Sequence, residues 1–342
     1  MIRKIIAAAL LCCLVLCFAA CKSGKEDLSS TGSVPTTELN FVNPLTGVKV
    51  AKDISKNRVV GVTINNLKKA QAVQTGLSKF DIVYEIPVEG GITRMMGVTQ
   101  DISALPQIGT VRSARKPFLE LAEGHGAIYV HAGYDYFHFA PLRKSLGVDT
   151  FDINTGKYSK YGFRQSNGLS SEHTMYTKGE KLAEGMKNLG FATTAENTAW
   201  LSFNDESAPV RPGAVGNSVS VKFSSSAISE FTYNAETGKY TKGANGTVWK
   251  DYLTGEGAEF TNVFVLFTTV TTCSDEKHHS LVDLNSGTGY YISNGGYEEI
   301  SWSKADTKSP LAFKRTDGTP LTANAGNSFV CITNIGSQVT IG

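Results

Sequence analysis

Ionisable side chains gather between residues 81 and 131 of this 342-residue sequence, each beside an apolar run typical of a strand or helix. They are Asp81, Glu85, Glu89, Arg94, Arg112, Arg115 and His131. Glu85 and Glu89 are four residues apart, so in an extended segment both side chains face the same side. Burial of two neighbouring carboxyl groups raises one pKa and gives an acid–base pair suited to hydrolysis. The alternative is a structural network in which Arg94 neutralises both glutamates.

A second group indicates an anion site at the start of a helix. Serine is a favourable N-cap and proline fits a first helical turn, so the sequence predicts that this turn spans Ser113 to Pro117. Free backbone N–H groups and guanidinium groups at such a terminus suit a carboxylate or phosphate. We therefore expect Arg94, Arg112, Ser113 and Arg115 to bind an anionic ligand, unless one of the two glutamates occupies the arginines.

The histidines give weaker signals. His131 at a strand end and His173 in a polar loop could join the glutamates as catalytic groups, although single histidines are more often structural. His278 and His279 follow an acidic loop, but adjacent strand residues point to opposite faces, so a solvated turn is the preferred interpretation. We predict no metal and no cofactor. The sequence lacks the GxSxG, HExxH, P-loop, dinucleotide-binding and CxxC patterns, which disfavours the enzyme classes that such motifs identify.

The first 40 residues predict where the protein works. Arg3 and Lys4 precede an uncharged apolar run that ends at Ala20 and is shorter than the roughly 20 residues of a membrane span. The run closes on Leu16-Cys17-Phe18-Ala19-Ala20-Cys21, which resembles a bacterial lipobox with Phe18 in place of the usual leucine. The resemblance implies a signal peptide over residues 1–20 and a lipid on Cys21. A secretory signal or a single-span anchor is the alternative, and the polar residues 21–40 predict a flexible tether.

The charge balance narrows the possible partners. Loss of residues 1–20 removes two basic residues and leaves 31 basic against 31 acidic side chains, so no nucleic acid is expected as a partner.

Of the six cysteines, only Cys273 and Cys331 remain besides Cys21 once residues 1–20 are removed. Both lie beside apolar, strand-like runs, so a disulfide is feasible and would close a loop of about 58 residues, worth about 4 kcal/mol. Two buried free thiols are slightly favoured.

The elements that must position these groups divide the chain into two halves. The first half predicts strands over residues 58–64, 80–86, 92–99 and 127–132, and amphipathic helices over 115–123 and 178–189. The second predicts strands over 218–223, 230–234, 247–252, 262–270, 289–293, 297–303 and 328–335. The expected fold class is α+β or α/β. A mixed α/β domain over residues 41–195 would precede a mostly antiparallel β domain over residues 196–342.

Several strings in order resemble one known family. They are Asn43-Pro44-Leu45-Thr46-Gly47, Tyr84-Glu85 with residues 87–94, residues 108–115, residues 129–133, residues 287–291 and Glu299-Ile300-Ser301-Trp302. Together they resemble the YerB-like lipoproteins of Gram-positive bacteria, a family with a two-part domain of unknown function, over residues 43–335. This sequence has Glu172-His173-Thr174 where the family usually has Pro-His-Asn. The resemblance implies location and a common fold, and no activity.

The sequence is compatible with two functions. The first is a membrane-anchored, extracytoplasmic lipoprotein that binds an anionic cell-envelope component or a partner protein through the arginine site. The alternative is a cell-envelope hydrolase in which Glu85 or Glu89 is the general base, and Arg112, Arg115 and a histidine position the substrate. An open cleft that holds an unpaired glutamate would favour the hydrolase.

Overall fold

The structure is a computed structural model that describes residues 39–196 and 199–342. Residues Leu39–Gly342 form one compact unit. The predicted signal peptide, Cys21 and residues 21–38 of the predicted tether lie outside the described residues. Among the residues that are described, no helix is long and apolar enough to span a membrane.

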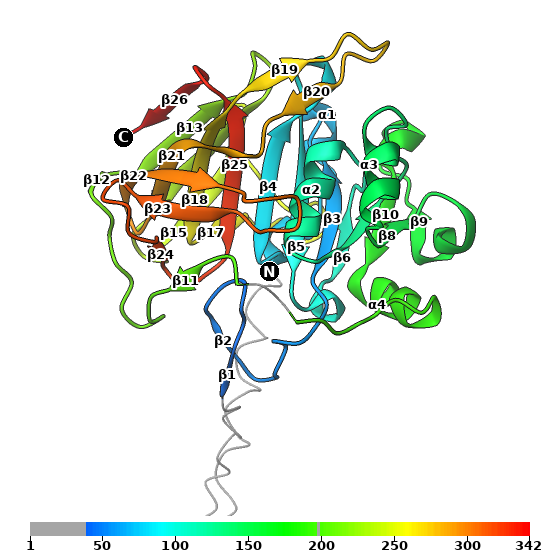
Figure 1. The fold of residues 1–342 in the computed structure, drawn as a ribbon, viewed down its shortest axis with the longest axis horizontal. Coiled ribbons are helices and arrows are strands. Elements are labelled where there is room, and N and C mark those ends of the chain that lie inside the picture. The colour runs from blue at the N-terminus through cyan, green and yellow to red at the C-terminus, as the bar shows by residue number, and fades with distance from the viewer. Residues whose placement is uncertain (1–38, 197–198) are drawn as a thin grey trace, which may run out of the picture. The chain divides into compact units, whose positions relative to one another are not determined.

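An eleven-stranded sheet runs through both halves of the chain (Figure 1). Its strands, in order across the sheet, are β12 (Ala214–Val215), β22 (Gly296–Ser303), β21 (Ser286–Ser293), β18 (Asn262–Thr268), β25 (Ser328–Asn334), β4 (Ile82–Pro87), β5 (Thr93–Thr99), β3 (Val60–Asn65), β7 (Ile128–His131) and β8 (Thr150–Asp152), with β23 (Ala312–Arg315) beside β22. β25 pairs in parallel with both β18 and β4, and so joins the second half of the chain to the first.

The central strands are buried on both faces, which explains their nearly continuous apolar sequences. Every residue of β3 is buried, as are the first six residues of β25. Side chains alternate between two cores: Ile82, Tyr84 and Ile86 of β4 belong to one, and Val83 belongs to the other. Glu85 is the next residue of β4 after Tyr84, so it faces the same side as Val83.

A second sheet covers part of the face on which Val83 lies. It contains β16 (Thr247–Val248), β15 (Lys239–Ala244), β14 (Ile228–Asn234), β13 (Ser218–Lys222) and β26 (Gln338–Ile341), with β17 (Glu259–Phe260) beside β15. Phe231 of β14 and Phe260 of β17 pack against Phe329 of β25, with ring centroids 5.0 and 5.1 Å apart. These aromatic contacts fix the second sheet to the first.

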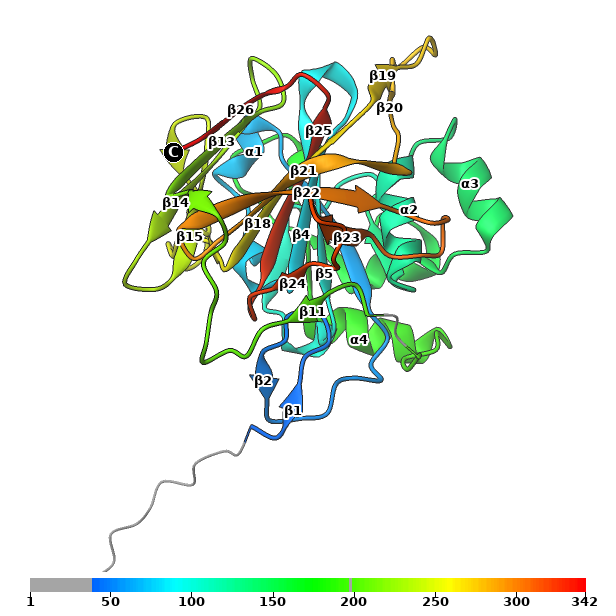
Figure 2. The ribbon, with the colours of Figure 1, turned by 60° about the vertical axis from the view of Figure 1, so that its left-hand side comes forward.

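The helices all lie before residue 189 of the described chain. They are α1 (Lys68–Gln71), α2 (Lys116–Gly124), α3 (Phe139–Leu146) and α4 (Gly179–Asn188). α2 buries Phe118, Leu119 and Ala122, and α4 buries Leu182 and Met186, as their spacing predicts. Figures 1 and 2 place α3 and β13 at opposite ends of the molecule. The structure is therefore mostly β, with few helices.

Short sheets and 3-10 turns complete the chain. The sheets are β1 (Phe41–Val42) with β2 (Lys49–Val50), β6 (Gln107–Gly109) with β10 (Met175–Lys178) and β9 (Gly162–Arg164), β11 (Ser202–Phe203) with β24 (Thr322–Ala323), and the hairpin β19 (Val270–Thr272) with β20 (Ser280–Val282). The 3-10 turns are Leu77–Lys79, Glu89–Gly91, Ile102–Ala104, Gly156–Tyr161 and Ser171–His173.

Most strand pairs of the second half are antiparallel, and β25 adds two parallel pairings, with β18 and with β4. Two expectations need correction. The strand expected over residues 247–252 is only β16, since beyond Val248 the chain makes just one isolated bridge, Lys250 with Gly257, before a turn begins at Tyr252. α2 begins at Lys116 with Arg115 as its N-cap, so Ser113 lies before the helix, whereas Pro117 does lie in its first turn. The domain boundary near residue 195 stays a prediction. Strands from both sides of it belong to one sheet.

The feasible disulfide between Cys273 and Cys331 is absent, and both thiols are free. Cys331 in β25 belongs to the core beneath the second sheet. Cys273 directly follows β19, and the hairpin packs Val270 and Val282 against the core on the other face. The two sulfur atoms are therefore held on different sides of the sheet.

Candidate functional site

Glu85 lies in a closed network inside the protein. Its Oε1 accepts hydrogen bonds from Asn66 Nδ2 (2.8 Å) and Thr93 Oγ1 (2.7 Å), and its Oε2 accepts one from Ser229 Oγ (2.6 Å). Lys242 Nζ donates to Ser229 Oγ (3.0 Å). All five residues are buried. Glu85 therefore faces the second sheet, with no approach for a substrate, and cannot be the base of an open active site.

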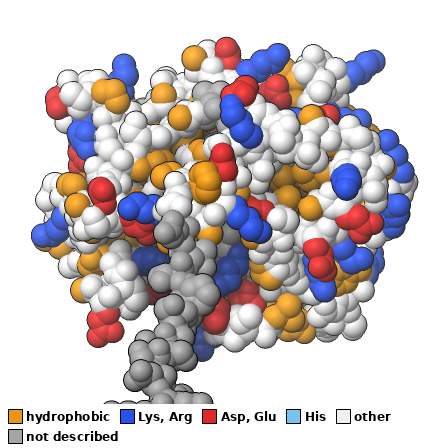
Figure 3. Space-filling model, turned by 90° about the horizontal axis from the view of Figure 1, so that it is seen from below, with side chains coloured by type: hydrophobic (Ala, Val, Ile, Leu, Met, Phe, Trp, Pro, Cys, Tyr) orange, Lys and Arg blue, Asp and Glu red, His pale blue; other side chains and the backbone are white. Residues whose placement is uncertain are grey.

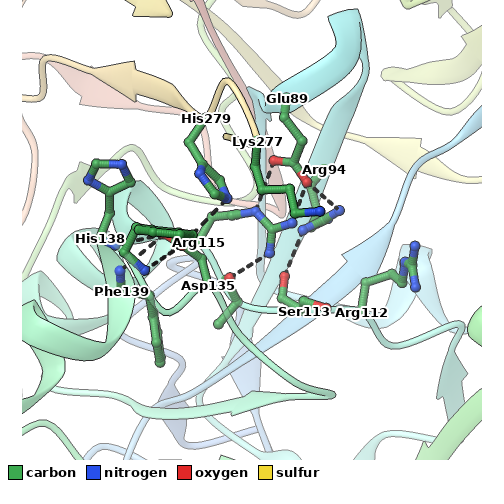
Figure 4. A network of polar contacts seen from close by, with 12 residues as sticks. Glu89, Arg94, Arg112, Ser113, Arg115, Asp135, His138, Phe139, Lys277 and His279 are labelled. Carbon is green, nitrogen blue, oxygen red and sulfur yellow. Dashed lines mark hydrogen bonds and ion pairs between the residues drawn. The ribbon is translucent and has the colours of Figure 1, made fainter. Parts of the chain in front are cut away.

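Glu89 has different partners. The chain turns after β4, and Glu89 begins the 3-10 turn Glu89–Gly91, where it accepts two hydrogen bonds from Arg115. Arg94 Nη2 lies 3.7 Å from Glu89 Oε1, and Arg94 Nη1 donates to the carbonyl oxygen of Ser113 (2.8 Å). Figure 4 shows these groups side by side. We name Glu89, Arg94 and Arg115 the Glu89 cluster. The two glutamates thus share no partner, and the expected acid–base pair does not form.

Electrostatics keep Glu89 ionised. Burial opposes its ionisation, but the hydrogen bonds and charge of Arg115 and the charge of Arg94 outweigh burial and lower its pKa to about 2. Burial, and next the charge of Arg115, lowers the pKa of Arg94 to about 9. A carboxylate with so low a pKa is a poor proton acceptor at neutral pH. Glu89 is thus a structural counterion of the two arginines, which was the alternative interpretation of the sequence.

The low pKa of Glu89 predicts a pH dependence of stability. A carboxyl group with a depressed folded-state pKa stabilises the fold above its unfolded value, here 4.5, and loses that contribution as the pH falls through about 2. We expect wild type to be more stable than Glu89→Gln at pH 7, and the difference to shrink between about pH 5 and pH 2. Urea unfolding of both proteins across this range measures it. A difference that does not vary with pH would contradict the assignment.

Arg112 points away from the Glu89 cluster, as Figure 4 shows. Its Nη2 donates to Glu172 Oε2 (3.0 Å) and its Nη1 to the carbonyl oxygen of Glu172 (3.1 Å). Arg112 Nε is buried, with no hydrogen-bond partner among the described residues. The expected four-residue arginine site therefore divides in two. Arg94 and Arg115 are neutralised by Glu89, and Arg112 faces a separate cavity together with Ser113.

This cavity, which we name the Arg112 cavity, has a volume of about 540 Å³. It lies where β7 and β8 end, next to the segment that follows β6 and pairs with β3. The carboxyl ends of parallel strands are a common place for ligands, because the loops that leave them diverge. The polar groups that line the cavity include those of Arg112, Ser113, Asp152, Asn154, Arg164 and Glu172, and Tyr134 and Tyr136 line it as well.

Hydrogen bonds hold the cavity lining in place. Asp152 Oδ1 accepts from the backbone N–H of Gly133 (2.9 Å) and of Asn154 (3.0 Å), which ties the ends of β7 and β8 together. Gly133 has a φ of 78°, and a β-carbon there would lie 3.5 Å from Ser113 Oγ. Arg164 Nη2 donates to Asn154 Oδ1 (2.9 Å). The lining is therefore ordered by its own backbone and side-chain contacts.

The two candidate histidines are buried and do not line the cavity. His131 Nδ1 lies 2.9 Å from the carbonyl oxygen of Gly133, and its ring packs against Tyr129 and Phe139. Burial lowers the pKa of His131 to about 4, so the ring is neutral at pH 7. His173 Nδ1 accepts from Asn65 Nδ2 (2.8 Å), which leaves its ring proton on Nε2, 3.1 Å from Glu172 Oε1. His173 thus lies behind Glu172.

Sequence reasoning missed part of the cavity. Arg164 lies at the end of the short strand β9, and Asp152 ends β8; neither strand was predicted. Tyr134 and Tyr136 follow β7, and their ring centroids are 4.8 Å apart, with Tyr136 73% exposed. One signal was available: two tyrosines close to the predicted end of a strand suggest a binding surface.

The fold and the cavity define a mostly β protein with an open, polar, arginine-lined cavity. Residues 45–192 match the family described as "Protein of unknown function (DUF3048) N-terminal domain", and residues 219–330 match the corresponding C-terminal domain. The chain therefore belongs to this family, and its sequence resemblance to YerB-like lipoproteins is confirmed.

One curated relative and one solved structure agree with that assignment. The chain is 28% identical over 287 residues to "Putative lipoprotein YerB" of Bacillus subtilis (strain 168), which covers 80% of this chain and 81% of the relative. The crystal structure of YerB from Bacillus subtilis has the same fold, with a TM-score of 0.75 and 24% identity, over 87% of this chain and 99% of that chain. The alternative function, a cell-envelope hydrolase, finds no support in these relatives.

Proposed function

We propose that this protein is a lipid-anchored lipoprotein of the cell envelope that binds an anionic saccharide polymer in the Arg112 cavity. The observation that carries the proposal is the lining of the cavity, where two guanidinium groups and a pair of tyrosines meet. Guanidinium groups bind carboxylate and phosphate with two parallel hydrogen bonds. Tyrosine rings offer an apolar face to the C–H groups of a sugar ring and a hydroxyl at the edge.

Glu172 occupies the position in which the anion of a ligand would bind. Its carboxylate accepts from Arg112 but is 50% exposed, and an exposed ion pair of this kind contributes little stability. A phosphate or carboxylate of the polymer can therefore replace it at small cost. Asp152 and Asn154 supply acceptors for sugar hydroxyls beside the arginines. Together these groups suit a ligand that is both anionic and rich in hydroxyls.

The charge on one face of the molecule argues against a purely electrostatic attachment of that face to membranes. The face seen from below carries basic and acidic side chains mixed together (Figure 3). A lipid on Cys21 would supply the membrane attachment that such a surface does not. The lipoprotein name of the Bacillus subtilis relative supports this anchor.

Replacement of Cys21 with serine should abolish lipid attachment, because the serine has no thiol to accept the diacylglycerol. We expect the Cys21→Ser protein to stay unprocessed or to be released into the medium. Cell fractionation and the intact mass of the protein test this. A Cys17→Ser variant is the control and should behave as wild type, whereas unchanged mass and membrane retention of Cys21→Ser would contradict the anchor.

The binding proposal predicts that Arg112→Gln and Arg164→Gln each weaken binding to purified anionic wall polymer about tenfold or more, because each removes charge-assisted hydrogen bonds. Melting temperatures should change little, since both side chains reach solvent. Isothermal titration of each variant gives the measurement. Arg211→Gln is the matched control: Arg211 donates to the carbonyl oxygen of Gly295 and does not line the cavity, so its loss should leave affinity unchanged. Equal affinity of the wild type and all three variants for the polymer would refute the proposal.

A further inference from the structure

A second polar cluster connects the start of α3 to the hairpin β19–β20. It contains Asp135, His138, Cys273, Asp275 and His279, and it lies outside the Arg112 cavity. Figure 4 shows His138, Asp135 and His279 next to the Glu89 cluster. His138 and Asp275 are 137 residues apart in sequence, so only the fold brings these groups together.

Three side chains of this cluster present ligand atoms to one point. One ligand atom each of His138, Cys273 and Asp275 lies within 4.8 Å of the others. His138 Nε2 is 2.8 Å from Asp275 Oδ2, and the Cys273 thiol also lies against the Asp275 carboxylate. Ligand atoms about 2.0–2.3 Å from a zinc ion are separated from each other by roughly 3.2–3.8 Å, so small side-chain rotations are enough.

The surrounding groups hold these ligands in place. Asp135 accepts hydrogen bonds from the backbone N–H groups of Phe137 (2.8 Å) and His138 (3.0 Å), which fixes the backbone that carries the His138 ring. His279 lies between two carboxylates, with Nδ1 3.1 Å from both oxygens of Asp275 and Nε2 3.4 Å from Asp135 Oδ1. Metal sites commonly have such carboxylate–histidine partners behind their ligands, because they orient the ligand groups.

We propose that His138 Nε2, Cys273 Sγ and the Asp275 carboxylate bind a Zn²⁺ ion, with His279 and Asp135 as positioning residues. Imidazole nitrogen, thiolate sulfur and carboxylate oxygen are the three ligand types of zinc in proteins, and three protein ligands leave a fourth position for water. The thiol loses one proton to solvent on binding, and the His138 ring carries its proton on Nδ1. The ion would fix the hairpin to α3 beside the Glu89 cluster.

The ligand chemistry selects the metal. The thiolate and imidazole favour Zn²⁺ over Mg²⁺, which prefers an octahedral shell of oxygen atoms. The thiolate and Asp275 together supply two negative charges to neutralise the ion. His278 directly precedes His279 in the sequence, but it is exposed, with a φ of 52°, and it does not belong to the ligand group. It therefore provides a matched control for His138.

Titration of Zn²⁺ into the full-length protein in detergent tests the site. We expect one Zn²⁺ per chain, affinity about 100-fold lower in Cys273→Ser and His138→Gln, and unchanged affinity in His278→Gln. His279→Gln should lose about 10–100-fold, as a positioning residue does. Mg²⁺ should show no binding at this site. Equal Zn²⁺ affinity of wild type, Cys273→Ser and His138→Gln would overturn the proposal.

A measurement on the unchanged protein guards against variants that fail to fold. Alkylation of Cys273, followed by mass spectrometry of the peptide that contains it, should slow at least tenfold when Zn²⁺ is added, because the bound thiolate is no longer a free nucleophile. Mg²⁺ at the same concentration should have no effect. Alkylation at the same rate with and without Zn²⁺ would also overturn the proposal.

Discussion

Replacement of Lys242 with methionine should lower the free energy of unfolding by about 3–5 kcal/mol, because it removes the only lysine of a buried network and leaves the Glu85 carboxylate in the core. Lys242 Nζ donates to Ser229 Oγ, and that hydroxyl donates to Glu85 Oε2 (2.6 Å). Burial lowers the pKa of Lys242, and the charge of Glu85 opposes this shift. The network joins the second sheet to β4 of the first, so its loss affects the contact between the two sheets.

Two variants separate this electrostatic effect from a loss of packing. Lys239→Met lies on the same strand at an exposed position, and its stability should stay within about 0.5 kcal/mol of wild type. The double variant Glu85→Gln with Lys242→Met should recover part of the loss, because it removes the stranded charge. Urea unfolding of the four proteins is the measurement. If Lys242→Met costs no more than Lys239→Met, the buried ion network does not stabilise the fold.

Replacement of Glu89 with leucine should cost a similar amount, about 3–5 kcal/mol, for the opposite reason. It leaves two guanidinium groups adjacent without their counterion. The Arg94 side chain is only 4% exposed, and its Nε already has no hydrogen-bond partner among the described residues. The charges of Arg115 and Arg112 both act against it. Thermal and urea unfolding should therefore show that Glu89→Leu lowers the free energy of unfolding more than most single substitutions do.

Glu180→Leu is the comparison for Glu89→Leu. Glu180 pairs with Lys178 at the surface, with 72% of its side chain exposed, so its loss should change stability by less than about 1 kcal/mol. Similar small losses in both variants would show that the Glu89 cluster is screened by solvent and contributes little.

The local parts of this structure follow from the sequence. The apolar runs over residues 58–64 and 80–86 predict β3 and β4, and Phe118, Leu119 and Ala122 predict the buried face of α2. Occupation of the arginines by Glu89 was one of the two alternatives weighed. The strands and the helix face depend on residues close in sequence, where periodicity carries the information, whereas Glu89 meets Arg115 across 26 residues.

The features that define the sites depend on distant residues. Nothing in the local pattern of β25 says that Cys331 pairs with Glu85 of β4, which lies almost 250 residues earlier. Alternation within β4 predicts which face Glu85 lies on, but not that the second sheet covers this face: Ser229, which binds the Glu85 carboxylate, is 144 residues away. Arg112 meets Glu172 across 60 residues, and His138 meets Asp275 across 137. Periodicity within a segment cannot predict such contacts.

The most direct test of the proposed function is binding of the wild-type protein to cell-wall preparations before and after chemical removal of their anionic polymers. We expect saturable binding to the intact wall that is lost after removal of these polymers and weakens as ionic strength rises, because the arginines of the cavity recognise the anionic groups. Equal retention on intact and stripped wall, at low and high salt, would contradict the Arg112 cavity as an anion-binding site.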